Sequence, residues 1–278
     1  ITGDPNYNGE DLDVLIDYVE LDAGDILTAK ALTTEEIVAE TAKLKDLRET
    51  AVQNSIKPGA DVTNLLKNND FSQGKTGWTF EAVSGGNVAA NDKAKCAEAW
   101  NNANFDIYQT IENAAVGAYK VSVQGFYRRG RGDNAWKLYC NQTTGEMLPN
   151  VPETPAYAYL NNSKTPLANV FEYKVPVADN YYTGDYYKDA FDYCFPNNMA
   201  DAGLAFDHGA YTINAVGVVA QKGDAMRIGM KGATNQDNDS WAIFTRFKLT
   251  YMGYDAEIIK PELEKTIAAV DLSKPMGA

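Results

Sequence analysis

Hydrophobic and polar residues alternate most clearly over AYKVSVQGFYRRG, residues 118–130. Tyr119, Val121 and Val123 fall on one face of an extended chain, and the polar residues between them fall on the other. A period of two residues is typical of a β-strand with one buried face. The pattern therefore predicts a half-buried strand in this segment.

Two more segments show the same apolar character. Residues 210–232 indicate two strands joined at Gly223-Asp224, and residues 240–253 indicate another strand. Turn residues separate these strands, and no helical pattern lies between them. The order favours a mainly β protein with an antiparallel sandwich over a parallel sheet of alternating strands and helices.

The N-terminal part of the chain has a helical pattern instead. Thr33 followed by Glu36 is typical of a capping box, in which each side chain accepts a hydrogen bond from a free backbone N–H of the first turn. A helix is predicted over about 34–53, ended by KPGAD at 57–61. Its apolar stripe comprises Ile37, Leu44, Leu47 and Ala51.

The first 21 residues contain a possible metal loop ahead of a shorter helical pattern at 11–21. Asp4, Asn6 and Asn8 fall at alternate positions of a calcium loop, but the twelfth position is Leu15 rather than a carboxylate. The stretch resembles half of a dockerin repeat with an abbreviated loop. A capped turn leading into a helix explains it as well.

These patterns divide the chain into three parts. We expect a helical N-terminal segment at 1–60, a β-sandwich at 61–253 and a helical linker to a further module at 254–278. The sandwich includes a Pro-, Asn- and Tyr-rich stretch at about 141–205. Because a structureless loop of that length is rare within a domain, we expect this insertion to be ordered.

Composition excludes several classes of function. The 278 residues carry a formal net charge of −13, whereas a nucleic-acid partner requires a basic surface. The one compact basic cluster, at 128–131, is short. No apolar run approaches the roughly 18 residues of a membrane span, so we expect no membrane insertion. The chain begins at Ile1 without a signal peptide, and we interpret it as a processed or excised segment.

Little in the sequence indicates catalysis. The single histidine, His208, precedes a glycine and is interpreted as a turn or packing residue. The 38 acidic residues leave no means of choosing a glycosidase pair. Cys96, Cys140 and Cys194 match no metal-binding spacing, and we expect three buried free thiols, with one disulfide plus one thiol as the alternative.

Sugar binding requires aromatic faces for the pyranose ring and planar polar groups for its hydroxyls. Such residues gather in WNNANFDIY at 100–108 and in FYRRGRGDNAW at 126–136. Trp100 and Trp241 suit the core, whereas Trp136 suits either role. The candidate ligand-binding residues are Trp136, Tyr127, Arg128, Arg129, Arg131, Asn134, Asn101 and Asn104.

The stretch NLLKNNDFSQGKTGWTF, residues 64–80, resembles the first strand and turn of carbohydrate-binding modules with the galactose-binding-like jelly-roll fold. Four later segments, within 97–111, 118–130, 194–216 and 239–253, resemble successive parts of such modules from large secreted or surface proteins of glycan-degrading gut bacteria. The resemblance covers about 62–253. It implies a jelly-roll β-sandwich in which Leu65 and Leu66 are core residues of the first strand and Trp78 is a structural residue.

Many related modules hold a structural calcium through two carboxylates. The corresponding positions here are Ser72 and Thr245, whose neutral hydroxyls suit calcium poorly, although Asp70 and backbone carbonyls keep that metal possible. We therefore expect no cofactor.

The function implied is non-catalytic: a glycan-binding module of an extracellular or cell-surface multidomain protein, with weak, multivalent binding. The alternatives are a structural or protein-interaction module without a sugar site and, less favoured, part of a glycoside hydrolase. A glycan site predicts Trp136 or Tyr127 facing solvent in a groove, whereas a scaffold predicts them buried.

Overall fold

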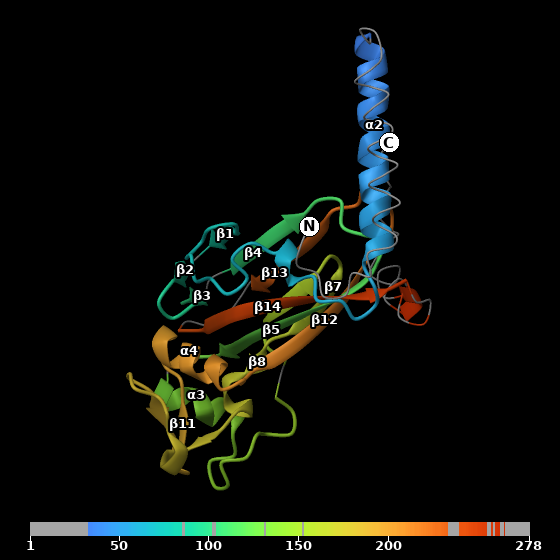
Figure 1. Cartoon of the computed structure of the whole chain (residues 1–278). Coiled ribbons are helices and arrows are strands. Elements are labelled where there is room, and N and C mark those ends of the chain that lie inside the picture. The colour runs from blue at the N-terminus through green and yellow to red at the C-terminus, as the bar shows by residue number, and fades with distance from the viewer. Residues whose placement is uncertain are drawn as a thin grey trace.

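Two antiparallel sheets pack face to face in the computed structural model, which confirms the predicted β-sandwich (Figure 1). The structure describes residues 33–254 except 85–86, 102–103, 131, 152 and 233–238, and also residues 257, 259–261 and 264. The expected calcium-like loop and helix before residue 33 lie outside the described residues, as does most of the expected C-terminal linker.

The first sheet has five strands in the spatial order β1-β4-β13-β6-β7. All neighbouring pairs in it are antiparallel. The strands are β1 (Thr79–Ser84), β4 (Asn104–Ile111), β13 (Met226–Gly232), β6 (Ala156–Leu160) and β7 (Ser163–Pro166). Strands β6 and β7 come from the expected insertion, so part of that stretch belongs to the sandwich itself.

The second sheet has six strands, with the path β12-β5-β14-β3-β2 and a short parallel strand added beside β5. The path comprises β12 (Thr212–Val219), β5 (Gly117–Arg128), β14 (Trp241–Gly253), β3 (Cys96–Trp100) and β2 (Asn87–Asn91), and the added strand is β8 (Ala168–Asn169). The two strands expected around Gly223-Asp224 are β12 and β13. They lie in different sheets, so the turn between them crosses the sandwich.

Strand β5 shows why the alternating pattern was informative. Tyr119, Val121 and Val123 are fully buried in the core between the sheets. Further along the strand, Tyr127 joins this core, whereas Phe126 points to the other face of the sheet and joins a second core. The second half of β5 is therefore buried on both faces.

The second core lies between the six-stranded sheet and a lobe built from helices, turns and short strands. The lobe lies at the end of the molecule opposite helix α2 (Figure 1). It contains α3 (Gly132–Tyr139), α4 (Met199–Asp207), the 3-10 turns η2 (Val170–Glu172) and η3 (Val177–Asp179), and a small sheet of β10 (Tyr187–Lys188), β11 (Tyr193–Phe195) and β9 (Val175–Pro176).

Helix α2 (Thr34–Ser55) projects away from the sandwich (Figure 1). The predicted capping box is present: the N–H of Glu36 donates to the Thr33 hydroxyl over 3.2 Å, and the N–H of Thr33 donates to the Glu36 carboxylate over 2.7 Å. Ile37 and Val38 are exposed. None of the described helices is both long enough and apolar enough to cross a membrane.

The stretch at 64–80 forms a corner rather than a first strand. Residues Thr63–Leu65 make the 3-10 turn η1, and β1 begins only at Thr79. The expectation that Leu65 is a core residue is wrong, since it lies on the outside of this turn, whereas Leu66 is buried. The amide of Asn68 bridges the corner by donating to the carbonyls of Gly74 and Thr76.

Trp78 has the structural role predicted for it. Its indole N–H donates to the carbonyl of Asn68 over 2.9 Å. Its ring lies 4.9 Å from that of Phe71 and 4.7 Å from that of Phe247 between ring centroids. Gly77 has a φ of +81°, a conformation that favours glycine, and sets Trp78 into this aromatic cluster.

The interpretations of the three cysteines and of the single histidine are confirmed. Cys96, Cys140 and Cys194 are buried free thiols, and burial raises the pKa of Cys96 to about 12. His208 caps the C-terminal end of α4, and its ring stacks on that of Tyr181 with 3.8 Å between centroids.

Candidate ligand-binding pocket

The predicted sugar-binding residues do not form one exposed surface. Tyr127 and Trp136 are 1% and 7% exposed, so neither faces solvent as a glycan site at these residues requires. Tyr127 faces the core between the sheets. Trp136 lies on α3 and packs edge-on against Phe191 in the second core, with 5.9 Å between centroids. Both aromatic rings are covered by the lobe or the opposite sheet.

The arginine cluster at 128–131 has one buried and one exposed side chain among its described residues. Arg128 is buried and lies over the ring of Trp241, and its Nε donates to the Gly130 carbonyl over 3.0 Å. Arg129 is exposed. Arg131 and the side chain of Asn134 lie outside the described part of the structure.

The asparagines of the other cluster are half-buried. Asn101 has a φ of +64°, and its N–H donates to the Ser240 carbonyl over 2.8 Å, which is a turn role. Asn104 begins β4. Trp241 is a core residue as expected, but the same expectation for Trp100 is wrong, because it is 37% exposed.

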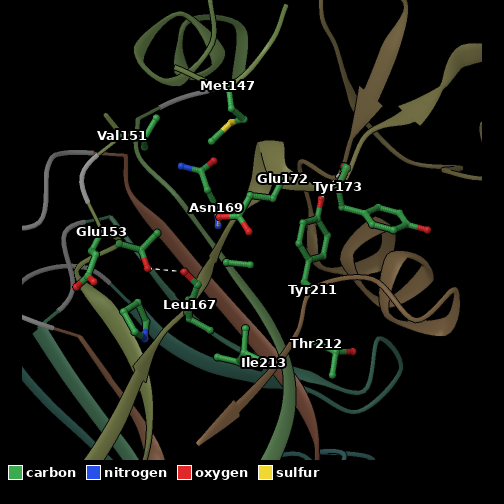
Figure 2. A pocket seen from close by; sticks show the side chains of 13 residues that line it. Met147, Val151, Glu153, Leu167, Asn169, Glu172, Tyr173, Tyr211, Thr212 and Ile213 are labelled. Atoms are coloured by element: carbon green, nitrogen blue, oxygen red, sulfur yellow. Dashed lines mark hydrogen bonds between the residues drawn. The ribbon is translucent and has the colours of Figure 1, made fainter. Parts of the chain in front are cut away.

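A pocket of about 560 Å³ opens where the lobe meets the edge of the sandwich (Figure 2). Residues from three parts of the chain line it: Met147, Val151, Glu153 and Thr154; 166–169 with 172–173; and 211–213. Its volume falls in the range typical of small-molecule sites. The apolar part of its lining includes Met147, Val151, Leu167, Tyr211 and Ile213.

Asn169 supplies an unpartnered donor to this pocket. Its side chain is part of the lining and the residue is 2% exposed, yet its Nδ2 has no hydrogen-bond partner among the described residues. Figure 2 shows the amide turned toward Met147 and Val151. Because an unpaired buried polar group costs about 1–3 kcal/mol, the site favours a ligand that accepts a hydrogen bond here.

The backbone around Asn169 fixes the orientation of this amide. Its Oδ1 accepts from the N–H of Phe171 over 3.0 Å, and its own N–H donates to the Glu172 carboxylate over 2.8 Å. This capping box begins turn η2. With Oδ1 occupied by the turn, Nδ2 is the polar atom of this amide that is left without a partner.

An aromatic pair forms one wall. The hydroxyl of Tyr211 lies 2.8 Å from the carbonyl of Val170, which holds the ring in place, and burial raises the pKa of Tyr211 well above its usual range. The ring of Tyr173 lies 5.6 Å from that of Tyr211 and is more exposed, at the rim. Figure 2 shows the Tyr211 ring facing the pocket and the Tyr173 ring turned outward.

Two carboxylates complete the polar lining. Glu153 and Glu172 both line the pocket and both are exposed. Carboxylates accept hydrogen bonds from hydroxyl groups and repel anions. Together with the Asn169 amide and the apolar walls, they suit a neutral ligand that carries hydroxyl groups on an apolar ring.

The pocket lies one strand away from a residue that the sequence predicted for the site. Tyr127 of β5, which it singled out, is the register partner of Asn169 on β8. The only local signal for Asn169 is the Asn-Val-Phe-Glu spacing of a capping box, which predicts a turn and carries no information about a ligand.

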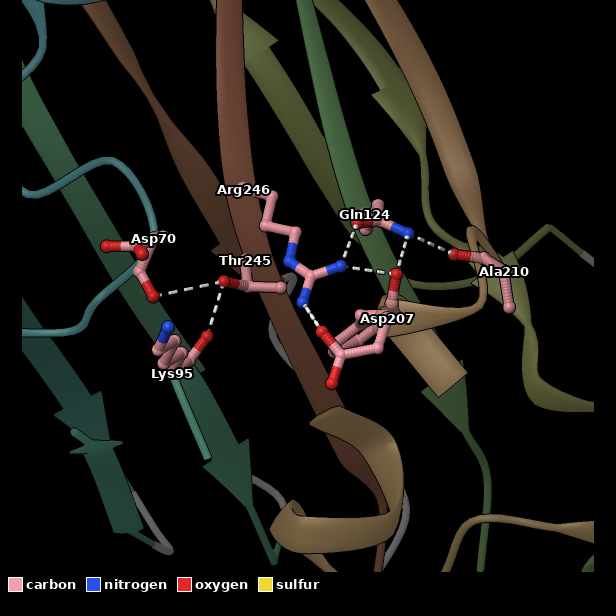
Figure 3. Close-up of polar contacts among 8 residues, drawn as sticks. Asp70, Lys95, Gln124, Asp207, Ala210, Thr245 and Arg246 are labelled. Carbon is pink, nitrogen blue, oxygen red and sulfur yellow. Dashed lines mark hydrogen bonds and ion pairs between the residues drawn. The ribbon is translucent and has the colours of Figure 1, made fainter. Parts of the chain in front are cut away.

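A second polar cluster, around Arg246, is held together by hydrogen bonds and an ion pair within the protein (Figure 3). Arg246 bonds to the carbonyl of Phe206 and the carboxylate of Asp207, and lies 3.3 Å from the Gln124 oxygen. The Gln124 amide donates to the carbonyls of Phe206 and Ala210. These bonds tie the end of α4 to the sandwich.

The residues at the calcium position implied by the resemblance do not fit that ion. The Thr245 hydroxyl lies 2.5 Å from the carbonyl oxygen of Lys95 and 3.2 Å from that of Asp70, and the residue is 1% exposed (Figure 3). Calcium prefers six to eight oxygen ligands with carboxylates among them. Here a neutral hydroxyl already joins the two carbonyls, and Ser72 brings no carboxylate.

The fold and pocket therefore define an antiparallel β-sandwich with a small-molecule-sized pocket at its junction with a lobe. No protein-family model matches the chain, and neither does any curated protein. One solved structure similar to it is TmCBM61 in complex with beta-1,4-galactotriose, at 14% identity and a TM-score of 0.29, over 67% of this chain and 97% of that chain. A likeness of that extent carries no argument about this protein.

Proposed function

We propose that this protein is a non-catalytic carbohydrate-binding module of a secreted or cell-surface multidomain protein, and that it binds a neutral sugar in the pocket beside Asn169. The observation that carries the proposal is the buried, unpartnered Nδ2 of Asn169 in that pocket. A sugar hydroxyl oxygen is the kind of acceptor that this donor lacks.

The rest of the lining supports the same class of ligand. Sugar hydroxyl protons would donate to Glu153 and Glu172, and the apolar face of the ring would lie against Tyr211 and Ile213. The two carboxylates disfavour an anionic ligand in this pocket. A polar ligand held by so few groups binds weakly, which suits a module that acts in several copies.

A glycan array of the purified chain, followed by calorimetry with the glycans that bind, tests this function. Asn169→Asp keeps the acceptor that caps η2 but replaces the donor by an oxygen, and we expect affinity to fall about three- to tenfold, the value of one hydrogen bond. Tyr173→Ala removes the exposed aromatic rim and tests the same pocket with little risk to folding.

Asn91→Asp is the matched control. Its side-chain oxygen also caps a turn, by accepting from the N–H groups of Lys93 and Ala94, and it does not line this pocket. Affinity should be unchanged in this variant, and affinities are compared only among variants that remain folded at the temperature of the titration. The proposal is wrong if the folded parent binds no glycan, or if Asn91→Asp weakens binding as much as Asn169→Asp.

A structural or protein-interaction module remains the second candidate, and one observation favours it. Tyr127 and Trp136 are buried, as a scaffold predicts. A folded parent that binds no glycan would support this alternative. The glycoside hydrolase alternative requires two carboxylates in a cleft, and it would be supported by hydrolysis of a bound oligosaccharide that Glu153→Gln and Glu172→Gln abolish.

A further inference from the structure

The outer face of the five-stranded sheet has a cationic hollow, although the chain as a whole carries a net charge of −13. The hollow measures about 250 Å³ and lies over β4, β13, β6 and β7. Its lining has three cations and one carboxylate, with aromatic rings between them. The residues that matter are Lys164, Arg227, Lys231, Asp106, Tyr157 and Tyr159.

The floor of this hollow is held rigidly by hydrogen bonds. The Tyr159 hydroxyl donates to Asp106 over 2.7 Å, and Arg227 donates to the other oxygen of Asp106 over 3.1 Å. The Nε of Arg227 also lies 3.1 Å from the Tyr159 hydroxyl, and its guanidinium lies 3.5 Å from the ring centroid of Tyr108. Arg227 is thus fixed flat against the sheet.

Gly229 makes room for this arrangement. A Cβ at this position would lie 2.4 Å from the carbonyl oxygen of Ile107 and 2.9 Å from the Tyr159 hydroxyl. Both distances are far below van der Waals contact. The absence of a side chain at Gly229 therefore allows the Tyr159 hydroxyl to reach Asp106.

Two lysines above the floor keep charge available to a ligand. Lys231 has its Nζ 3.6 Å from Asp106, and its side chain is 46% exposed. Lys164 is exposed and has its Nζ 5.3 Å from the ring centroid of Tyr157. Asp106 alone cannot neutralise three cations. The nearby carboxylate of Glu81 accepts from the Tyr108 hydroxyl and is not part of the hollow.

We propose that this hollow binds an acidic sugar, with its carboxylate between Lys164 and Lys231 and its ring against Tyr157. The excess of cations selects an anion, and the half-buried Tyr157 ring provides an apolar face for a pyranose. The choice of a sugar over another small anion rests on the proposed carbohydrate function, but the cationic hollow does not. The contact is exposed, so salt weakens it.

Calorimetric titration of the full chain with the trimer of galacturonic acid tests this site. Galactotriose serves as the neutral counterpart, and sodium sulfate at matched ionic strength serves as the small anion. Lys231→Gln should weaken binding of the acidic trimer about two- to fivefold, the value of one exposed charge contact. Lys164→Gln combined with Lys231→Gln should weaken it about tenfold.

Lys248→Gln provides a closely matched control. Lys248 lies on β14 of the other sheet, 3.5 Å from the carboxylate of Asp61, and its side chain is similarly exposed. Binding should be unchanged in this variant. Equal losses in Lys231→Gln and Lys248→Gln would overturn the proposal, because they indicate a nonspecific charge effect.

Three other outcomes would also overturn it: no binding of the acidic trimer, equal binding of galactotriose at this hollow, or binding of sulfate as strong as that of the trimer. Failure here leaves the Asn169 pocket untouched, because that pocket is tested with neutral glycans and Asn169→Asp. Conversely, Asn169→Asp should not alter binding of the acidic trimer.

Discussion

Thr245 and Lys95 are joined by a hydrogen bond of 2.5 Å from the threonine hydroxyl to the lysine carbonyl, across 150 residues of sequence. The same hydroxyl lies 3.2 Å from the carbonyl of Asp70. Three parts of the chain thus meet at one side-chain oxygen: the corner before β1, the turn before β3 and the middle of β14.

Thr245→Val should destabilise the protein because it keeps the shape of the side chain but removes the hydroxyl that bonds the partly buried carbonyls of Lys95 and Asp70. We expect the free energy of unfolding to fall by about 1–3 kcal/mol, measured by urea denaturation. Thr250 on the same strand is half-buried, and its hydroxyl has no hydrogen-bond partner among the described residues, so Thr250→Val should change the free energy of unfolding by less than about 0.5 kcal/mol. Equal stability of Thr245→Val and the parent would contradict this role.

We expect the position around Thr245 to hold no calcium, so calcium should not stabilise the sandwich. A ligand that binds only the folded state stabilises it, by about 2.7 kcal/mol at one hundred times its dissociation constant. The Thr245 hydroxyl already joins the carbonyls of Lys95 and Asp70, where a calcium ion would otherwise sit. We therefore expect identical melting curves in calcium and in a chelator. A rise in melting temperature with calcium that is lost in Asp70→Asn would contradict this expectation.

Gly77 and Gly74 should respond differently to alanine. Both have positive φ values, +81° and +59°, but a Cβ at Gly77 would lie 2.8 Å from the Cβ of Lys67, whereas a Cβ at Gly74 meets no atom within 4 Å. Gly74→Ala should lower the free energy of unfolding by about 1 kcal/mol, because alanine disfavours the left-handed backbone conformation. Gly77→Ala should lower the free energy of unfolding by about 1–3 kcal/mol more, because its Cβ would also clash with Lys67.

Denaturation of the two glycine variants under identical conditions measures this difference. Tryptophan fluorescence provides a second readout, because Gly77 precedes Trp78. If both variants lose the same stability, the close approach of residues 67 and 77 contributes nothing and the corner depends on backbone conformation alone.

Glu98 should make the protein less stable as pH rises. Its pKa is raised above the ordinary value of 4.5, mainly because burial disfavours the charged form, while the indole N–H of Trp241 and the charge of Arg128 oppose this effect. A carboxyl group with a raised folded pKa binds its proton more tightly in the folded state. Its deprotonation therefore costs stability as pH passes through the folded pKa.

Glu98→Gln isolates this effect, because the amide oxygen can still accept from Trp241. The variant should be more stable than the parent at pH 7, and the difference should shrink toward pH 4, where the parent's Glu98 is protonated. Paired melting curves across that range measure it. A difference that stays constant with pH would assign the change to packing rather than to the charge.

The sequence predicted those parts of the fold that depend on local periodicity. Tyr119, Val121 and Val123 alternate with polar residues, and Thr33 and Glu36 have capping-box spacing, so strand β5 and helix α2 could be recognised. The burial of Trp136 could not be recognised. It depends on contact with Phe191, more than 50 residues later, and no local pattern encodes that contact.

The candidate pocket was beyond sequence reasoning for a related reason. Asn169, Tyr211 and Met147 are brought together only when the lobe packs beside the sandwich. Each of them has an ordinary local explanation as a turn or core residue. What distinguishes Asn169 is a missing hydrogen-bond partner, and a missing partner is visible only in three dimensions.

The second half of strand β5 is buried on both faces, which couples the unfolding of the lobe to that of the sandwich. Phe126 supports the lobe and Tyr127 supports the sandwich from adjacent positions of one strand. Neither unit can open along β5 without exposing aromatic surface of this shared strand, so we expect hydrogen exchange in both to be governed by one cooperative event. A shortened chain without the lobe would still contain the strands of both sheets. It would lose the residues that cover Phe126 and those that form one wall of the pocket beside Asn169.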